Sequence, residues 1–148
     1  MNVLPVASIG AGGIAQAHLR AISQLQQIEA VAVMDTNPQS LQAIVTQYRL
    51  RPYDNLEAVL NDPQVEAVHV CTPHCLHADQ VVTAAQAGKH VLVEKPMALS
   101  VADCDRMIAA CEANHRLLMV GQVMRYYPTN RRIKAMIADG EKSAKSAI

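Results

Sequence analysis

The sequence has no excess of charge of either sign, because 13 lysine and arginine residues balance 13 aspartate and glutamate residues among its 148 residues. A chain without a basic face offers little to nucleic acid or to an anionic membrane, so neither partner is expected. The sequence also lacks an apolar run of the ~20 residues that a membrane span requires, and its N-terminus has neither the positive flank nor the apolar length of a signal peptide. We therefore expect one globular domain in the cytoplasm.

The sequence lacks a disulfide framework, because its four cysteines are too few for the dense pattern of a small secreted protein. Cys71, His74, Cys75 and His77 place four potential metal ligands in one short segment, but no second ligand pair at zinc-finger spacing occurs elsewhere. We predict reduced thiols and no metal site. In this interpretation Cys71 is a small buried residue at a strand end, and the other three open the next helix.

Short, valine-rich apolar runs alternate with helical patterns along the chain. Such alternation is typical of βαβ units and of a parallel sheet covered by helices on both faces. The predicted strands span 3–9, 30–34, 67–71, 90–93 and 117–120, with a weaker one at 51–53. The predicted helices span 14–25, 39–48, 56–60, 78–87 and 101–113. We predict an α/β fold with a doubly wound, mostly parallel Rossmann sheet.

Helix caps agree with these boundaries. Asn37 before Pro38 suits an N-cap followed by proline in the first helical position, and Gly88 ends its helix. Ser100 followed by Asp103 is a variant of the capping box.

A glycine-rich loop directly follows the first predicted strand and opens a helix. It consists of Gly10, Ala11, Gly12, Gly13, Ile14 and Ala15, which form the pattern G-x-G-x-x-A. The first glycine permits a tight turn, the second lets a pyrophosphate approach the backbone, and the alanine keeps the helix close to the strand. The free N–H groups of the helix N-terminus would then bind the phosphates.

An acidic residue stands where a dinucleotide-binding fold needs one. Asp35 ends the second predicted strand, where its carboxylate would accept hydrogen bonds from the adenosine ribose diol. It would repel a 2′-phosphate, and neither Thr36 nor Asn37 supplies the arginine that accommodates one. NAD is therefore favoured over NADP. The alternative is a Rossmann-like sheet without a nucleotide, because glycine-rich turns also occur for packing alone.

Several motifs occur together in one order: GAGGIAQAHL, the Asp35 strand end, CTPHCLHADQVVTAAQAGKHVLVEKPMALS and VGQVMRYYP. This order resembles the N-terminal domain of the Gfo/Idh/MocA oxidoreductase family, which includes glucose-fructose oxidoreductase and inositol 2-dehydrogenase. The resemblance covers residues 3 to about 140. It implies a dehydrogenase that uses NAD(H) to oxidise a secondary alcohol of a sugar or polyol, or to reduce the matching ketone.

The resemblance also assigns residues at the carboxyl ends of two strands. Thr72 and Pro73 would line the cofactor cleft, and His77 would begin the next helix beside it. An ordinary histidine at a helix N-terminus is the alternative for His77. Glu94 and Lys95 match the family's Glu-Lys-Pro motif, which lies beside the nicotinamide.

Lys95 is the predicted catalytic residue, because an ammonium group can orient the substrate oxygen and stabilise developing negative charge. The alternative is a solvated lysine after an edge strand. Arg125 matches a family arginine near the cofactor and the domain junction, and its alternative is a surface arginine.

In similar enzymes a second, α+β substrate domain follows, and it brings the aspartate and histidine associated with proton transfer. We expect that domain to be missing here, with residues 1–124 forming the Rossmann domain and 125–148 a helix and tail. The chain alone should then be inactive, and the full-length enzyme should be a homo-oligomer. A non-catalytic dinucleotide-binding sensor or scaffold stays open as an alternative, as does a ligand-free remnant, although Lys95 and the glycine loop disfavour them.

Overall fold

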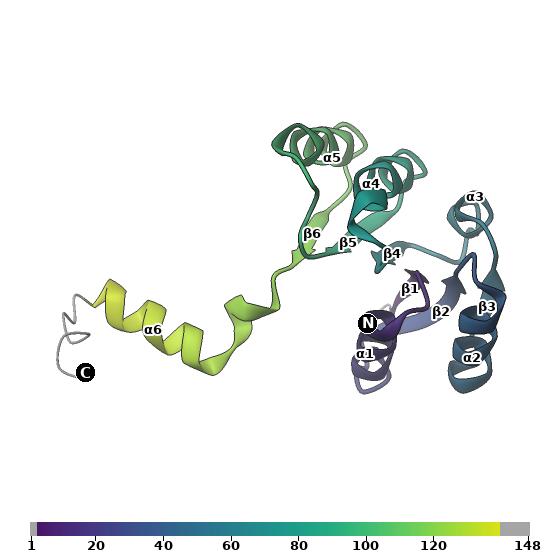
Figure 1. The fold of residues 1–148 in the computed structure, drawn as a ribbon, viewed down its shortest axis with the longest axis horizontal. Coiled ribbons are helices and arrows are strands. Elements are labelled where there is room, and N and C mark those ends of the chain that lie inside the picture. The colour runs from purple at the N-terminus through teal and green to yellow at the C-terminus, as the bar shows by residue number, and fades with distance from the viewer. Residues whose placement is uncertain (1–2, 140–148) are drawn as a thin grey trace.

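The computed structural model describes residues 3–139, which form a six-stranded parallel sheet in the order β3-β2-β1-β4-β5-β6 (Figure 1). The strands are β1 (Leu4–Ile9), β2 (Ile28–Met34), β3 (Arg51–Tyr53), β4 (Ala67–Val70), β5 (His90–Glu94) and β6 (Leu118–Gly121). The strand order reverses between β1 and β4, so the predicted doubly wound Rossmann sheet is confirmed.

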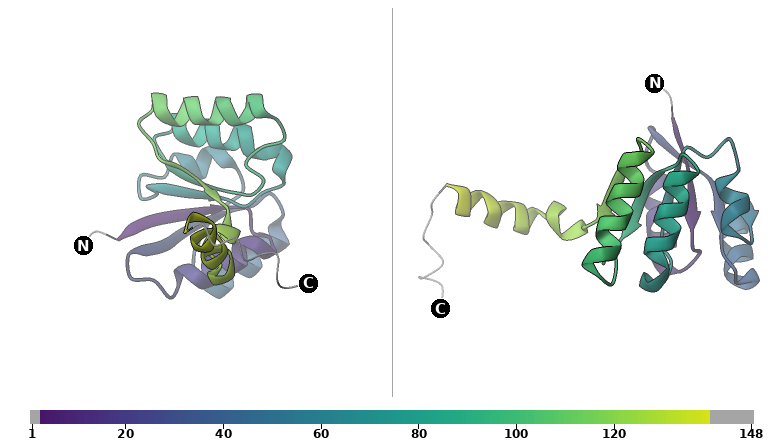
Figure 2. Two further views of the ribbon diagram at one scale, coloured as in Figure 1. Left: turned by 90° about the vertical axis from the view of Figure 1, so that its left-hand side faces the viewer. Right: turned by 90° about the horizontal axis from the view of Figure 1, so that it is seen from above.

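Helices lie on both sides of the sheet, with α3, α4 and α5 on one side and α1 and α2 on the other (Figures 1 and 2). They are α1 (Gly13–Ile22), α2 (Pro38–Tyr48), α3 (Leu56–Leu60), α4 (His77–Gln86), α5 (Val101–Ala113) and α6 (Pro128–Ala138). Among the described residues, no helix has both the length and the apolar character to cross a membrane.

Two apolar clusters form the core, one on each side of the sheet. The larger cluster joins Val81 of α4 and Met107 of α5 to alternate strand residues such as Ile9 and Val70. The smaller cluster lies under α1 and α2 and is built from Ala11, Leu19, Val33, Ile44 and Leu50. This second cluster fixes α1, and with it the glycine loop, against the sheet.

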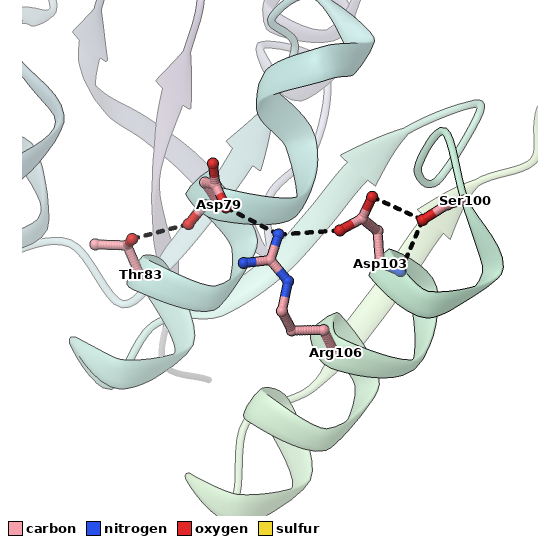
Figure 3. Close-up of polar contacts among 5 residues, drawn as sticks. All are labelled: Asp79, Thr83, Ser100, Asp103 and Arg106. Carbon is pink, nitrogen blue, oxygen red and sulfur yellow. Dashed lines mark hydrogen bonds and ion pairs between the residues drawn. The ribbon is translucent and has the colours of Figure 1, made fainter.

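The capping residues occupy the expected positions. The Asn37 side chain accepts hydrogen bonds from the N–H groups of Gln39 and Ser40 at the start of α2, and Gly88 has a positive φ of 76° after α4. Ser100 Oγ accepts from the N–H of Asp103 (3.1 Å) and donates to its carboxylate (2.8 Å), as Figure 3 shows. These contacts confirm the predicted helix starts.

An ion pair on the surface ties α4 to α5. Arg106 of α5 donates to Asp103 of the same helix (3.0 Å) and to Asp79 of α4 (2.9 Å) (Figure 3). Arg106 and Asp79 are exposed and Asp103 is half-buried, so the pairs add little to stability and mainly fix how the two helices lie side by side.

The structure differs most from the sequence prediction at three places, while several other element boundaries are displaced by one residue. Helix α1 ends at Ile22, not at residue 25, and β2 begins at Ile28, two residues earlier than predicted. Helices cover both faces only in part, because α1 and α2 contact β2 and β3, while Met119 of β6 and Leu117 just before this strand are exposed. Crossovers change sides where the strand order reverses, so within the described residues no crossover helix covers β5 and β6 on the α1 side.

The chain leaves the sheet after β6. Helix α6 extends away from the sheet, which both figures of the whole fold show (Figures 1 and 2). The predicted helix after residue 125 is thus present, and the polar tail beyond Asp139 lies outside the described residues.

Candidate functional site

The glycine loop connects β1 to α1 and contains two glycines with different structural needs. Gly10 is buried at a φ of +100°, and a Cβ there would lie 2.9 Å from the carbonyl oxygen of Cys71. Gly12 has an ordinary φ of −74° and ψ of −174°, and a Cβ there would meet no atom within 4 Å. The fold therefore requires glycine at position 10 but does not require it at position 12.

The N-terminus of α1 faces open space. Gly12 is its N-cap and provides no side-chain hydrogen bond, so the first N–H groups of the helix keep their capacity for a ligand. Gly13 and Ile14 are exposed, whereas Ala15 is completely buried. This arrangement matches the expected geometry, in which the alanine brings helix and strand together and the preceding backbone stays accessible to an anion.

Asp35 lies directly after β2 and holds the glycine loop in place. Its Oδ2 accepts a hydrogen bond from the N–H of Ala11 (2.7 Å), and its Oδ1 accepts one from the N–H of Asn37 (2.7 Å). A carboxylate has about four acceptor positions, so these two bonds leave capacity for the two hydroxyls of a ribose. Sequence reasoning assigned Asp35 to ligand binding and missed its bond to the loop.

The segment after β4 brings Thr72 and Pro73 to the carboxyl edge of the sheet, with Pro73 exposed. The Thr72 hydroxyl donates to the side chain of Gln80 on α4. His77 begins α4 as expected, but its ring is completely buried, with Nδ1 3.0 Å from the carbonyl oxygen of Pro96 and Nε2 3.0 Å from that of Thr72. His77 thus contacts two loops, and its expected place beside the cofactor stays a prediction.

The Glu-Lys-Pro segment lies at the end of the neighbouring strand β5. Glu94 is buried, and its carboxylate oxygens accept from His18 Nε2 (2.6 Å) and from the N–H of Lys95 (3.2 Å). Lys95 itself is exposed at the edge where the glycine loop and the Thr72 segment also end. Arg125 is exposed in the short helical turn Val123–Tyr126 after β6.

Under α1 lies a polar cluster that sequence reasoning missed. His18 of α1 stacks edge-on against His69 of β4, with ring centroids 3.9 Å apart. Burial, assisted by His18, lowers the pKa of His69 to about 3, so this ring is neutral. Burial and the Glu94 carboxylate raise the pKa of Cys71 to about 12, against the effect of a hydrogen bond with Ser8.

Metal-binding capacity differs between the predicted cluster and the observed one. His74 and Cys75 are exposed while Cys71 and the His77 ring are buried, and although the rings of His74 and His77 lie 5.5 Å apart, these four residues do not form a ligand group among residues 3–139. Ligand atoms of His18, His69 and Cys71 do lie within 4.8 Å of one another. A metal there would need the Cys71 thiolate, which burial disfavours, and would compete with Glu94 for His18.

The glycine loop, Asp35 and the Thr72 segment thus follow the carboxyl ends of β1, β2 and β4, where strand order reverses and where open α/β sheets bind their ligands. The family model of the Gfo/Idh/MocA oxidoreductases, described as an oxidoreductase family with an NAD-binding Rossmann fold, matches residues 4–122. The chain belongs to this family.

Curated relatives of this Gfo/Idh/MocA chain act on different compounds. The 2,7-anhydro-N-acetylneuraminate hydratase of Mediterraneibacter gnavus is 34% identical over 140 residues, which are 95% of this chain and 37% of the relative. Inositol 2-dehydrogenase of Salmonella typhimurium is 34% identical over 137 residues, 90% of this chain and 41% of the relative. The chain thus spans about two fifths of the length of these relatives.

Solved structures of the family superpose closely on this fold. The WlbA dehydrogenase of Bordetella pertussis, in complex with NADH and UDP-GlcNAcA, has a TM-score of 0.91 at 35% identity, covering 94% of this chain and 43% of that one. The 3-ketoreductase KijD10 of Actinomadura kijaniata, in complex with NADP and TDP-benzene, has a TM-score of 0.88 at 28% identity, covering 94% and 43%. Both nicotinamide cofactors therefore occur among proteins similar to this chain.

Proposed function

We propose that this chain is the cofactor-binding domain of an oxidoreductase that transfers a hydride between NAD(H) and a secondary alcohol or ketone of a sugar or polyol. Residues 1–124 form the dinucleotide-binding part in this proposal, and residues 125–148 lead toward a substrate domain. The family membership and the sugar-related names of several relatives support it.

The observation that carries the proposal is a glycine at position 12 that the fold does not require. The fold itself would accept a larger residue there, since the backbone conformation is ordinary and no neighbour lies within 4 Å of a Cβ. A glycine that packing does not require, at an uncapped helix N-terminus, is accounted for by a ligand that approaches the backbone. The pyrophosphate of a dinucleotide has the charge and the size for this position.

Asp35 supports NAD as the preferred cofactor. Its carboxylate lies at the end of β2, fixed by two N–H groups, and the adjacent Thr36 and Asn37 carry no positive charge for a 2′-phosphate. A ribose diol would complete the acceptor capacity of the carboxylate, whereas a phosphate would be repelled.

Lys95 is the proposed catalytic residue. When bound, the nicotinamide supplies the chemistry of hydride transfer. An alcohol that loses hydride must also lose its hydroxyl proton, and the Lys95 ammonium would hydrogen-bond that oxygen and stabilise its developing negative charge. The remaining substrate contacts and the proton acceptor are assigned to the second domain, so we propose that this chain alone shows no turnover. We also propose that it binds no metal.

Titration calorimetry of NAD into the 148-residue protein tests the proposal. We expect saturable binding of one NAD per chain and weaker binding of NADP. A folded protein that produces no heat and no thermal shift at millimolar NAD contradicts the proposal. An NADP affinity above that for NAD would contradict only the interpretation of Asp35.

A further inference from the structure

Two histidines from different helices hold the Glu94–Pro96 segment on either side of Lys95. His18 of α1 contacts the Glu94 carboxylate at 2.6 Å, and His77 of α4 contacts the Pro96 carbonyl oxygen at 3.0 Å. The residue before Lys95 and the residue after it are thus each fixed by an imidazole ring.

We propose that His18 and His77 are positioning residues that hold the Lys95 loop against the glycine-loop helix and the Thr72 loop, so that the three loops form one wall for the nicotinamide end of the cofactor. This inference rests on the proposed function. Neither ring has to touch the cofactor for this role.

His77 links the ends of β4 and β5. Its ring is completely buried, and its two nitrogens lie 3.0 Å from the carbonyl oxygens of Thr72 and Pro96. Carbonyl oxygens only accept, so a neutral ring donates to one of them and a protonated ring donates to both. In either state the rigid ring sets the distance between the two loops.

His18 links the Lys95 loop to α1, the helix that the glycine loop opens. One Glu94 oxygen lies against His18 on α1, the helix whose N-terminus is the proposed phosphate site, and the other accepts the N–H of Lys95. Glu94 is also confined from the β6 side, because a Cβ on Gly121 would lie 3.1 Å from its Oε1. The Glu94 carboxylate therefore connects the backbone of Lys95 to α1, the helix that would bind the pyrophosphate.

Such bracing matters because the Lys95 side chain is exposed and long, so its backbone determines where the ammonium can reach. A displacement of about 1 Å in a positioned group can cost about a hundredfold in rate. The adenosine half of the cofactor, near Asp35, lies beyond β1 in the sheet order and has no contact with either histidine in the proposal. The two halves of the ligand should consequently respond differently to loss of the brace.

The test compares NAD with ADP-ribose, which lacks the nicotinamide, in calorimetric titrations of the 148-residue protein. We expect His77→Phe and His18→Leu to lower NAD affinity about three- to tenfold, the loss of one or two hydrogen bonds, and to leave ADP-ribose affinity within about twofold. The emission change of NADH on binding should decrease in both variants. His74→Phe is the matched control and should behave as wild type, because it replaces an exposed ring that packs edge-on against His77 (centroids 5.5 Å) by another aromatic ring and removes no hydrogen bond to either loop.

His77→Gln keeps one donor and should give an intermediate NAD affinity, and it carries the test if the phenylalanine variant does not fold. Equal losses for NAD and ADP-ribose, or no loss for NAD, would overturn the inference. A wild-type protein that binds ADP-ribose as tightly as NAD would overturn the inference as well, but it would not contradict the proposed phosphate site. A wild-type protein that binds neither ligand would overturn the proposed function and this inference together.

Discussion

Replacing each of two glycines by alanine should separate what the loop needs for folding from what it needs for binding. At Gly10 an alanine would keep a φ of +100° and place its Cβ 2.9 Å from the Cys71 carbonyl oxygen. A strained positive φ costs about 1–3 kcal/mol and overpacking about 1–3 kcal/mol more. Gly10→Ala should therefore lower the free energy of unfolding by about 2–6 kcal/mol, a large share of a typical 5–15 kcal/mol.

At Gly12 the same substitution meets no atom within 4 Å and an ordinary backbone conformation. Its stability should stay within about 1 kcal/mol of wild type, because the entropic gain of Gly→Ala offsets a weaker N-cap. The new methyl would instead occupy the proposed pyrophosphate position. NAD affinity should fall by about 1–3 kcal/mol, or about 5- to 150-fold.

Urea unfolding and calorimetric titration of both variants provide the assay. The reasoning is refuted if Gly12→Ala binds NAD as tightly as wild type. It is also refuted if the two variants lose the same amount of stability, because folding should need glycine at position 10 and not at position 12.

Three further predictions concern the cofactor, the buried cluster and catalysis. Asp35→Ser combined with Thr36→Arg should reverse a wild-type preference for NAD over NADP in paired titrations, and unchanged preference would remove Asp35 from cofactor selection. Burial lowers the pKa of His69 to about 3, against 6.5 for an unperturbed histidine, so the fold should lose stability as pH falls below 6.5 and the unfolded chain takes up a proton that the folded one does not. The free energy of unfolding should fall by about 2–3 kcal/mol between pH 7 and about pH 4.5 through this residue. Urea unfolding of His69→Leu should show a smaller decrease over that range, and equal decreases in both proteins would contradict the assignment. Lys95→Ala should abolish NADH formation from polyols in a longer protein that includes the substrate domain, and an unimpaired variant would exclude Lys95 from catalysis. The 148-residue chain should show no turnover with or without the substitution.

The parts of the site that could be predicted from sequence depend on short-range pattern. The glycine loop follows a valine-rich strand and opens an amphipathic helix, and Asp35 directly follows the next strand. Both features could therefore be predicted from the pattern of a single βαβ unit. Helix ends were predictable where a cap is local, as at Asn37, and less so at Ile22, where the chain turns early into β2.

The histidine contacts could not be predicted in the same way, because they join residues far apart in sequence. His18 and Glu94 are 76 positions apart, and their contact depends on which side of the sheet α1 packs and on the register of β5. The signal that could have pointed to them is a polar residue in a buried position, such as His69 within the strand Ala67–Val70. That signal marks burial but does not identify the partner.

Backbone chemical shifts of the 15N-labelled protein, recorded with and without NAD, test the central claim most directly. The account predicts that NAD shifts the amide signals of Gly12, Gly13 and Ala11, with further changes beside Asp35 and Lys95, while amides of α5 stay in place. ADP-ribose should reproduce the glycine-loop changes but not those beside Lys95. Saturating NAD that leaves the Gly12 and Gly13 signals unmoved would contradict the claim that this loop binds a dinucleotide.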